Sequence, residues 1–349
     1  MAWECRRNFG FWILDFGLKI LLFTFYFLLF TFSTGCGKPK QVFSKTQVLM
    51  GTIAEIKIIA DDPIIAEETI KRCFERVKKI EDEMSFQNSE SELSCLNHNR
   101  KMKVGKDLFY ILEKSLAYAK LSNGAFDVTI GPLTELWGFS EDKRIIPSRA
   151  QIAQKAVLVD YQQVKLNPRN KEVFLPIEGM KIDLGGVAKG YAVEEAMEII
   201  KTAGIKDALV NIGRNIKVIG KNPSGKTWMI GLQHPRNEDE ILSAFPLKGD
   251  MSVATSGDYE HFFIDKDRRY HHLLDPKSGY PTNLCISVTI ITPSAMIADI
   301  LSTAVFILGE SAGMDLIEKL DTVEGVIVTD SGIRVSSGLV NKIKLAKFP

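Results

Sequence analysis

Several features that would point directly to a function are scarce in this chain. Its 349 residues include five cysteines, at Cys5, Cys36, Cys73, Cys95 and Cys285, and no two of them form a Cys-x-x-Cys pair. This odd, scattered set supports neither a disulfide framework nor a zinc site. Charge of one sign is lacking too: 44 basic and 43 acidic residues are interspersed, with a formal net charge of +1. The charge pattern therefore gives no indication of nucleic-acid binding.

A long apolar stretch is present near the N-terminus. Arg6 and Arg7 precede it, its strongest part runs from Ile20 to Phe32, and the small residues Ser33-Thr34-Gly35 come directly before Cys36. This order of basic, apolar and small residues is typical of a secretory signal. Small residues directly before a cysteine also resemble a bacterial lipobox, in which that cysteine becomes the lipidated first residue of the mature chain.

We therefore predict a signal peptide over residues 1–35, lipidation of Cys36 and a linker over 36–47. The alternative is an uncleaved anchor, because residues 9–32 could nearly span a bilayer. Either interpretation places the folded part outside the cytoplasm, held at a membrane.

From residue 48 to 349 the sequence predicts one domain of mixed α/β or α+β class. Apolar residues at helical spacing predict helices over 63–84, 106–121 and 294–308. Alternating or β-branched runs predict strands over 50–58, 181–184, 208–212, 215–219, 227–232 and 285–292, and a hairpin over 325–335. Helices interleaved with sequentially local strands favour this class over a β-sandwich.

The most informative motif is Asp183-Leu-Gly-Gly-Val-Ala-Lys-Gly190, at the expected junction of a strand and a helix. Glycines at such a junction let backbone N–H groups approach a phosphate, and the helix N-terminus adds partial positive charge. Asp183 cannot bind phosphate itself, so it suggests a metal or a ligand hydroxyl nearby. The alternative is that Asp183 caps the helix while the glycines only permit a tight turn.

A second motif, Ala298-Asp-Ile-Leu-Ser-Thr-Ala304, places Asp299 and Thr303 four residues apart, hence on one helix face. The neighbouring residues are apolar nearly all round this helix, so a carboxylate there needs a partner. Carboxylate, hydroxyl and backbone carbonyl oxygens are the hard donors that suit Mg²⁺. The alternative for Asp299 is an acid that faces solvent.

Three further segments carry chemically useful groups. Gly124-Ala-Phe-Asp127 has an acid beside an aromatic directly after a helix stop. Ser252 to Tyr259 places hydroxyls and a glycine at a strand end, where Ser256 and Gly257 could bind phosphate or a ring edge. His272 lies three residues before Asp275 and a turn; the alternative is that His271 and His272 are an ordinary pair on a surface strand.

These residues together resemble the ApbE family of flavin transferases, also called FAD:protein FMN transferases. The resemblance runs from about Met50 to Gly309. Its fragments are Met50-Gly-Thr, Ser91-Glu-Leu-Ser, Ala125-Phe-Asp, Gly131-Pro-Leu with Trp137-Gly-Phe, Asp183 to Gly190, Ala254-Thr-Ser-Gly-Asp-Tyr, His272-Leu-Leu-Asp-Pro and Ala298 to Ala304. Their order and spacing make the resemblance specific.

The resemblance implies a duplicated, T-fold-like α/β domain on the periplasmic side of the inner membrane. It implies Mg²⁺-dependent transfer of FMN from FAD to a Thr hydroxyl of acceptor flavoproteins in membrane redox complexes, with AMP leaving. Asp299, Thr303 and the carbonyl of Ala188 would hold Mg²⁺, and His272 would be the general base. Asp258 and Asp275 are the runner-up polar groups. Residues expected to contact FAD are Met50, Gln87, Ala125, Phe126, Asp127, Asp183, Gly185, Lys189, Tyr191, Ser256, Gly257 and His272.

Two departures from the family pattern stand out. The family usually has an aromatic residue shortly after the position of Met84-Ser85, and Gln87 aligns with it. Loss of that ring would weaken FAD retention and favour turnover, including hydrolysis of FAD to FMN and AMP. Arg214 stands where the family commonly has a second glycine, and it either touches the ligand or only requires a relaxed turn. A flavin-binding lipoprotein without catalysis is the remaining alternative.

Overall fold

The computed structural model describes residues 40–139, 145–237 and 239–345, and from Gln41 onward the chain forms one compact unit. The predicted signal peptide and Cys36 lie outside the described residues. Strand β1 begins at Gln41, so most of the segment predicted as a linker over 36–47 belongs to the fold. In the part of the chain that the structure describes, no helix is long and apolar enough to cross a membrane.

A large antiparallel sheet organises the fold. The strands are β1 (Gln41–Leu49), β2 (Thr52–Ala60), β3 (Lys101–Lys103), β4 (Lys165–Asn167), β5 (Glu172–Phe174), β6 (Asp207–Ile212), β7 (Asn215–Ile219), β8 (Trp228–Gln233), β9 (Ile241–Leu247), β10 (Met251–Gly257), β11 (Phe262–Asp265), β12 (Arg268–His271), β13 (Ser287–Thr292), β14 (Glu324–Thr329), β15 (Gly332–Val335) and β16 (Lys344–Leu345). The large sheet has the order β1-β2-β6-β7-β10-β13-β14-β15. Strands β8, β9 and β16 form a small sheet, and β11 pairs with β12.

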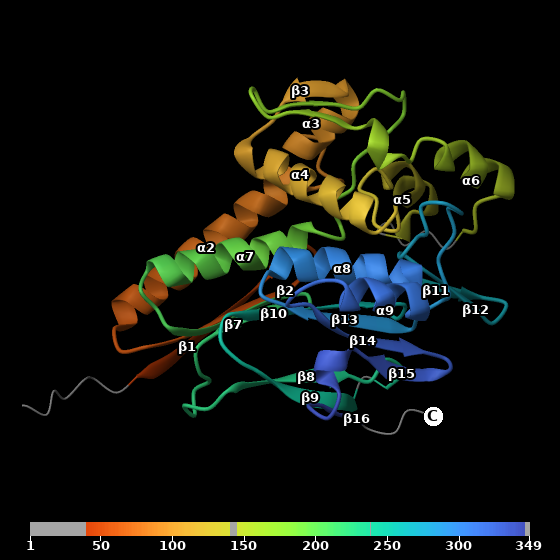
Figure 1. Cartoon of the computed structure of the whole chain (residues 1–349). Helices are drawn as coiled ribbons and strands as arrows, with labels where there is room; N and C mark the ends of the chain where they lie inside the picture. The colour runs from red at the N-terminus through yellow and green to blue at the C-terminus, as the bar shows by residue number, and fades with distance from the viewer. Residues whose placement is uncertain (1–39, 140–144, 238, 346–349) are drawn as a thin grey trace, which may run out of the picture. The chain divides into compact units, whose positions relative to one another are not determined.

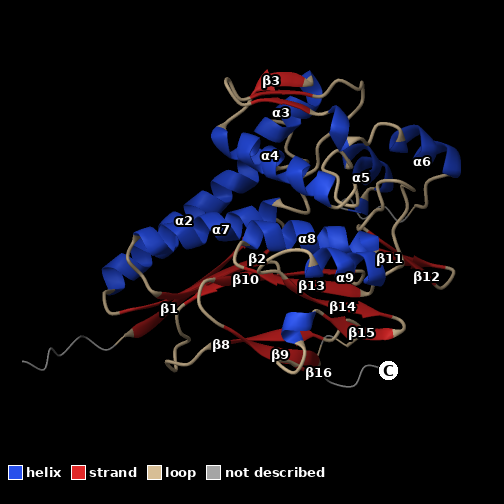
Figure 2. Ribbon diagram, viewed as in Figure 1, coloured by secondary structure: helices blue, strands red, loops and turns tan. Residues whose placement is uncertain are grey.

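The helices are α2 (Pro63–Met84), α3 (Glu92–Asn99), α4 (Lys106–Leu121), α5 (Gly131–Trp137), α6 (Arg149–Ala156), α7 (Ala188–Thr202), α8 (Ala295–Leu308) and α9 (Glu310–Glu318). Helices α2, α7, α8 and α9 cover one face of the large sheet, as Figures 1 and 2 show. The small sheet packs its apolar side chains against the opposite face. The domain therefore has three layers, and the mixed α/β class is confirmed.

Local signals fixed the ends of the predicted helices. Helix α2 begins at Pro63, and the Asp62 side chain accepts the backbone N–H groups of Ile64 and Ile65 at 2.8 and 3.2 Å. Helix α8 begins after Ser294 and ends at Gly309, whose φ of +80° is a conformation that favours glycine.

Two expected strands differ in the structure. Residues 181–184 do not form a strand; Lys181 makes only an isolated bridge to Ile130. This segment instead turns directly into α7. The strand expected over 50–58 begins at Thr52, because Met50 and Gly51 have φ of +54° and +70° and form the turn of the β1–β2 hairpin.

The three described cysteines are free thiols. Cys73 and Cys285 are buried and none of the three described cysteines is in a disulfide. Burial raises the pKa of the Cys73 and Cys285 thiols to about 12, so both are protonated at neutral pH and pack as small apolar groups.

Candidate active site

The Asp183 motif forms a tight turn into α7. The Asp183 side chain accepts the N–H of Gly185 at 2.8 Å, and the Leu184 carbonyl accepts the N–H groups of Val187 and Ala188 at 3.0 and 2.9 Å. Helix α7 then begins without a side-chain cap. The carboxylate of Asp183 is thus partly used within its own turn but does not cap α7, so the capping alternative is not what the structure shows. Gly185 remains exposed just before the helix.

Gly190 allows helices α7 and α8 to approach each other closely. A Cβ atom at this position would lie 2.4 Å from the carbonyl oxygen of Ala295 and 2.6 Å from the Cβ of Asp299. The close approach lets the Gly190 N–H donate to Oδ2 of Asp299 at 2.8 Å. Because Gly190 is the third residue of α7, the Asp299 carboxylate lies at the positive end of that helix.

Asp299 is buried, with 6% of its surface exposed. Burial raises the pKa of this carboxyl group, against the opposing effects of Lys189, the Gly190 N–H and a hydrogen bond from the Asn215 side chain. Asp299 therefore does not face solvent, and the fold supplies two hydrogen bonds to its carboxylate. The raised pKa nevertheless indicates that its charge is not fully compensated.

Two adjoining cavities contain most of the predicted site residues. We call the first, of about 160 Å³, the Asp299 cavity; its lining includes Ala125, Phe126, Asp127, Asp183, Gly185, Lys189, Asn215, Ser256, Gly257, Glu260, His272, Asp299 and Thr303. We call the second, of about 620 Å³, the Met50 cavity; its lining includes Met50, Phe86, Gln87, Asp183, Gly185, Ala188, Lys189, Glu260 and His272. The residues that line both cavities are Asp183, Gly185, Lys189, Gly213, Glu260 and His272.

His272 lies at this junction, and a hydrogen bond fixes its tautomer. Its Nδ1 atom is 2.9 Å from the backbone carbonyl oxygen of Glu260, and a carbonyl can only accept, so Nδ1 carries the proton and donates. Burial, together with the neighbouring His261, lowers the pKa of His272 to about 3. The imidazole is therefore neutral at pH 7, and its Nε2 atom has a lone pair available to accept a proton.

The runner-up acids are occupied elsewhere. Asp258 accepts two hydrogen bonds from Arg236, at 2.6 and 2.7 Å. Asp275 accepts the backbone N–H groups of Lys277 and Ser278 within its own turn. The carboxylate of Asp127 is also hydrogen-bonded within the protein. It accepts from the N–H and the hydroxyl of Thr129 and from the N–H of Tyr161. His272 thus remains the better candidate for a general base.

A cation at Asp299 would be held by oxygen atoms of mixed type. No group of three or more His, Cys, Asp and Glu side chains gathers as a metal site anywhere in the described ranges. Asp299 and Thr303 line the same cavity, and a buried oxygen, Oδ1 of Asn215, has no hydrogen-bond partner among the described residues. Carboxylate, hydroxyl and amide oxygens are hard donors, so this set fits Mg²⁺.

Tyr191 does not belong to either cavity. Its hydroxyl donates to Oδ1 of Asp107 at 3.0 Å and accepts from Arg76 at 3.1 Å, and it lines a separate surface hollow beside Lys106. Two residues along a helix point in nearly opposite directions. Because Lys189 faces the two cavities, Tyr191 faces away from them and lines neither, so this geometry gives its predicted FAD contact no support.

Gln87 is exposed and lines the Met50 cavity, and an aromatic residue stands beside it. Phe86 lines the same cavity while its ring packs on the main core. The aromatic residue of the family can therefore correspond either to Gln87 or to Phe86, because both line this cavity.

Sequence reasoning missed Asn215 and Glu260. Asn215 begins β7 directly after the two-residue turn at Gly213 and Arg214, and Glu260 follows the Gly257-Asp-Tyr segment. A single amide or carboxylate gives no recognisable spacing, and β7, which carries Asn215, reaches the site through its long-range pairing with β10. The only available signal was their position next to motifs already noted.

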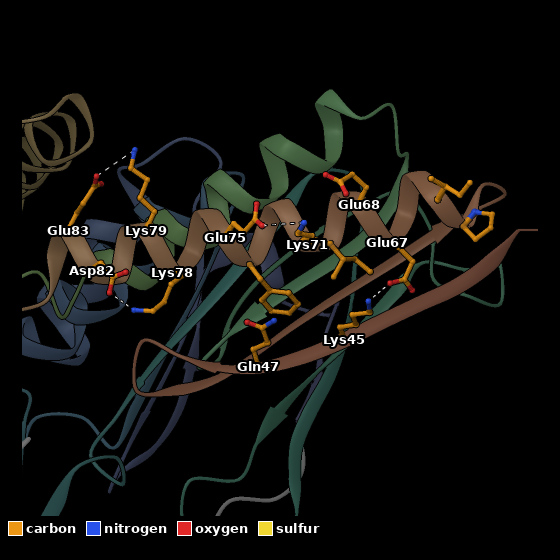
Figure 3. Close-up of a pocket in the computed structure, with 14 residues that line it drawn as sticks. Lys45, Gln47, Glu67, Glu68, Lys71, Glu75, Lys78, Lys79, Asp82 and Glu83 are labelled. Atoms are coloured by element: carbon orange, nitrogen blue, oxygen red, sulfur yellow. Dashed lines mark hydrogen bonds and ion pairs between the residues drawn. The ribbon is translucent and has the colours of Figure 1, made fainter.

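A larger groove, of about 1200 Å³, runs along α2 beside β1 and is shown in Figure 3. Lys45 pairs with Glu67, Lys71 with Glu75, Lys78 with Asp82 and Lys79 with Glu83. Such exposed pairs contribute little energy, and they neutralise one another. No residue of the sequence motifs lines this groove, so the two adjoining cavities are the candidate active site.

The chain is similar to known proteins of one family. Residues 50–327 match the ApbE family. The chain is 32% identical to the FAD:protein FMN transferase of Haemophilus influenzae, over 89% of this chain and 94% of the relative. Its structure resembles that of the ApbE protein from Thermotoga maritima, with a TM-score of 0.79 and 33% identity over 86% of this chain and 99% of the other. The flavin transferase ApbE from Vibrio cholerae gives a TM-score of 0.78 and 27% identity, over 87% and 100% of the two chains.

The fold and the paired cavities define a nucleotide-type site on an α/β scaffold. With more than half of the chain matched, the protein belongs to the ApbE family.

Proposed function

We propose that this protein transfers the FMN half of FAD to a threonine hydroxyl of an acceptor protein and releases AMP, in a reaction that depends on Mg²⁺. The observation that carries the proposal is the junction of the two cavities. A dinucleotide has two bulky ends joined by a pyrophosphate, and here two cavities join at a glycine turn, a lysine and a helix N-terminus. These groups suit a pyrophosphate.

The reaction requires displacement at phosphorus. The threonine oxygen forms a new bond to the phosphorus of the FMN half, and the bond from that phosphorus to the oxygen of the AMP phosphate breaks. The hydroxyl proton passes to Nε2 of His272, which is available because Nδ1 is committed to the Glu260 carbonyl. AMP leaves with the bonding electron pair, and the FMN phosphate becomes a diester of threonine.

Mg²⁺ would be held by Asp299, Thr303 and the carbonyl of Ala188. When bound, the ion supplies charge neutralisation at the pyrophosphate oxygens. The chain itself contributes Lys189, whose Nζ donates to the Gly185 carbonyl at 3.2 Å and is thereby held beside the glycine turn. The exposed Gly185 lets the backbone approach a phosphate without obstruction from a side chain.

The test uses the mature chain with FAD and Mg²⁺, with and without a candidate acceptor such as a flavoprotein subunit of a membrane redox complex. AMP release coupled to flavin fluorescence that stays on the acceptor through denaturing electrophoresis is the expected result. AMP and free FMN without labelled acceptor would instead identify an FAD pyrophosphatase, the activity that exposed Gln87 favours through weaker FAD retention. Tight FAD binding without AMP would identify a non-catalytic flavin-binding protein.

We further propose that Cys36 is lipidated and tethers the domain to the periplasmic side of the inner membrane. The support is the order of basic, apolar and small residues before this cysteine. Cys36→Ser should leave a precursor that is neither acylated nor cut at this position. Metabolic labelling with a fatty acid and mass spectrometry measure acylation and cutting. Normal acylation and cutting of the substituted protein would rule out the lipobox.

A further inference from the structure

Arg214 occupies an unfavourable position in the turn between β6 and β7. The turn has two residues, Gly213 and Arg214, with φ of +54° and +70°. Two-residue turns of this type require left-handed conformations at both positions, which favour glycine and asparagine. The Arg214 N–H donates to the side chain of Asn211 at 3.2 Å, so the turn is held despite its arginine.

The Arg214 side chain lies between two neighbours and leaves one donor unused. Its Nε atom is 3.3 Å from Oε1 of Glu260, and its guanidinium carbon is 5.3 Å from the centre of the Tyr259 ring. Its Nη1 atom is buried and has no hydrogen-bond partner within the described ranges. A left-handed backbone and a buried, unused donor are both unfavourable, and such costs concentrate at functional sites.

Both neighbours of Arg214 belong to the segment that orients His272. The backbone carbonyl of Glu260 accepts the Nδ1–H of His272 at 2.9 Å, and Glu260 lines both cavities. Tyr259 folds back over Gly257, where a Cβ atom would lie 2.4 Å from its ring. An arginine that holds the Glu260 carboxylate and the Tyr259 ring therefore restrains the peptide that fixes the imidazole.

We propose that Arg214 is a positioning residue for His272. By holding residues 259 and 260 in place, it keeps the His272 Nδ1–H on the Glu260 carbonyl and keeps the Nε2 lone pair available at the junction of the two cavities. The proposal rests on the function proposed above, in which Nε2 accepts the hydroxyl proton. It also accounts for an unfavourable arginine where the family commonly has glycine.

The decisive variant is Arg214→Gly, because glycine suits the turn and the fold should survive. Its melting temperature should rise or stay within about 2 °C of the parent, while kcat for AMP release falls about tenfold, as expected when a catalytic group is displaced. The KM for FAD should change less than about threefold. Arg214→Lys, which keeps the charge beside Glu260, should recover part of the lost kcat.

The matched control is Asp267→Gly. Asp267 has a φ of +63° at the second position of the two-residue turn between β11 and β12, so the substitution relieves the same backbone conformation away from the site. It should leave kcat unchanged. Equal losses of kcat in the two glycine variants would overturn the proposal, because the effect would then come from backbone flexibility alone.

A readout in the ligand-free protein separates this proposal from the proposed function. Nitrogen NMR of the histidine rings, with His272 assigned through His272→Gln, should give one tautomer with the proton on Nδ1 in the parent and a mixture in Arg214→Gly. If the parent releases no AMP from FAD, the proposed function fails while this measurement still decides the role of Arg214. An unchanged His272 tautomer in Arg214→Gly would overturn the positioning role.

Discussion

Helix α7 contacts two polar clusters, one partly buried and one at a cavity, that differ in how fully their groups are paired. On one side, Arg76 donates to Asp107 at 2.6 Å and to Glu195 at 2.6 and 2.9 Å, and the Tyr191 hydroxyl donates to Asp107. We call these four residues the Arg76 cluster. Near the N-terminus of the same helix lies the Asp299 cavity, where the Oδ1 atom of Asn215 has no partner among the described residues.

The pKa values follow the same division. Burial opposes ionisation of Asp107, yet hydrogen bonds and charge from Arg76, together with the Tyr191 hydroxyl, lower the pKa of Asp107 below its ordinary value. Burial instead raises the pKa of Asp299, because its partners only partly compensate its charge. Full pairing within the protein indicates a structural role, whereas incomplete pairing in a cavity indicates that a ligand completes the site.

The largest expected effect comes from Asp299→Asn. The amide keeps an acceptor for the Gly190 N–H but removes the charge that would hold Mg²⁺. AMP release should fall on the order of 10³-fold, about 4 kcal/mol of lost transition-state stabilisation. Binding of Mn²⁺, measured by calorimetry, should also be lost in this variant.

The stability of Asp299→Asn should be unchanged or higher at pH 7, since the substitution removes a poorly compensated buried charge. Thr303→Val serves as the milder companion, because a neutral hydroxyl contributes less than a carboxylate to holding the ion. A normal rate with a normal Mg²⁺ requirement in Asp299→Asn would show that the metal lies elsewhere, and Asp183 would be the next candidate.

Arg76→Met should lower stability and leave activity unchanged, the opposite of Asp299→Asn. It leaves Asp107 and Glu195 without their cation, so the free energy of unfolding at pH 7 should fall by about 3 kcal/mol, as for one partner removed from a buried pair. Measured below its melting transition, AMP release should stay near the parent rate, because the Arg76 cluster faces away from the cavities. A large loss of activity with unchanged stability would contradict the structural role.

Low pH should reduce the difference in the free energy of unfolding between Arg76→Met and the parent. A carboxyl group whose pKa is lowered by folding stabilises the protein above its unfolded pKa, near 3.9 for aspartate. That contribution is lost as the pH falls through the lowered pKa of folded Asp107. Urea unfolding of parent and variant at pH 7, 5 and 3 should therefore show a gap that narrows below about pH 4. A gap of constant size would mean that Arg76 stabilises through packing alone.

His272→Gln tests the base directly and should lower AMP release about 100-fold, the range of a lost general base. With its pKa lowered to about 3, His272 stays neutral from pH 5 to pH 9. The pH profile of AMP release by the parent should consequently show no inflection near pH 6.5 that comes from His272. Such an inflection would mean that the ring is more exposed to water during turnover.

The contrast between the clusters also explains what the sequence could predict. Helices α2, α4 and α8 were predicted because their apolar spacing is a local signal, to which Asp62 and Ser294 add caps for α2 and α8. The pairing of β2 with β6 and of β7 with β10 depends on distant segments, so the position of Asn215 beside Asp299 could not be read from spacing. The structure places Tyr191 outside both cavities, because closeness in a motif says nothing about side-chain direction on a helix.

The smallest expected effect concerns the rim of the Met50 cavity. Gln87→Tyr would add a ring that can pack on the adenine of FAD, worth about 1 kcal/mol, or about a fivefold lower Kd. FAD should be retained longer and hydrolysed more slowly, as measured by fluorescence titration and AMP release. Gln87→Leu is the control, because it adds apolar surface without an aromatic ring. If both variants tighten FAD equally, the gain is apolar burial rather than stacking. If neither changes the Kd, the ring that the family places here corresponds to Phe86, which already lines this cavity, and Gln87 does not limit FAD retention.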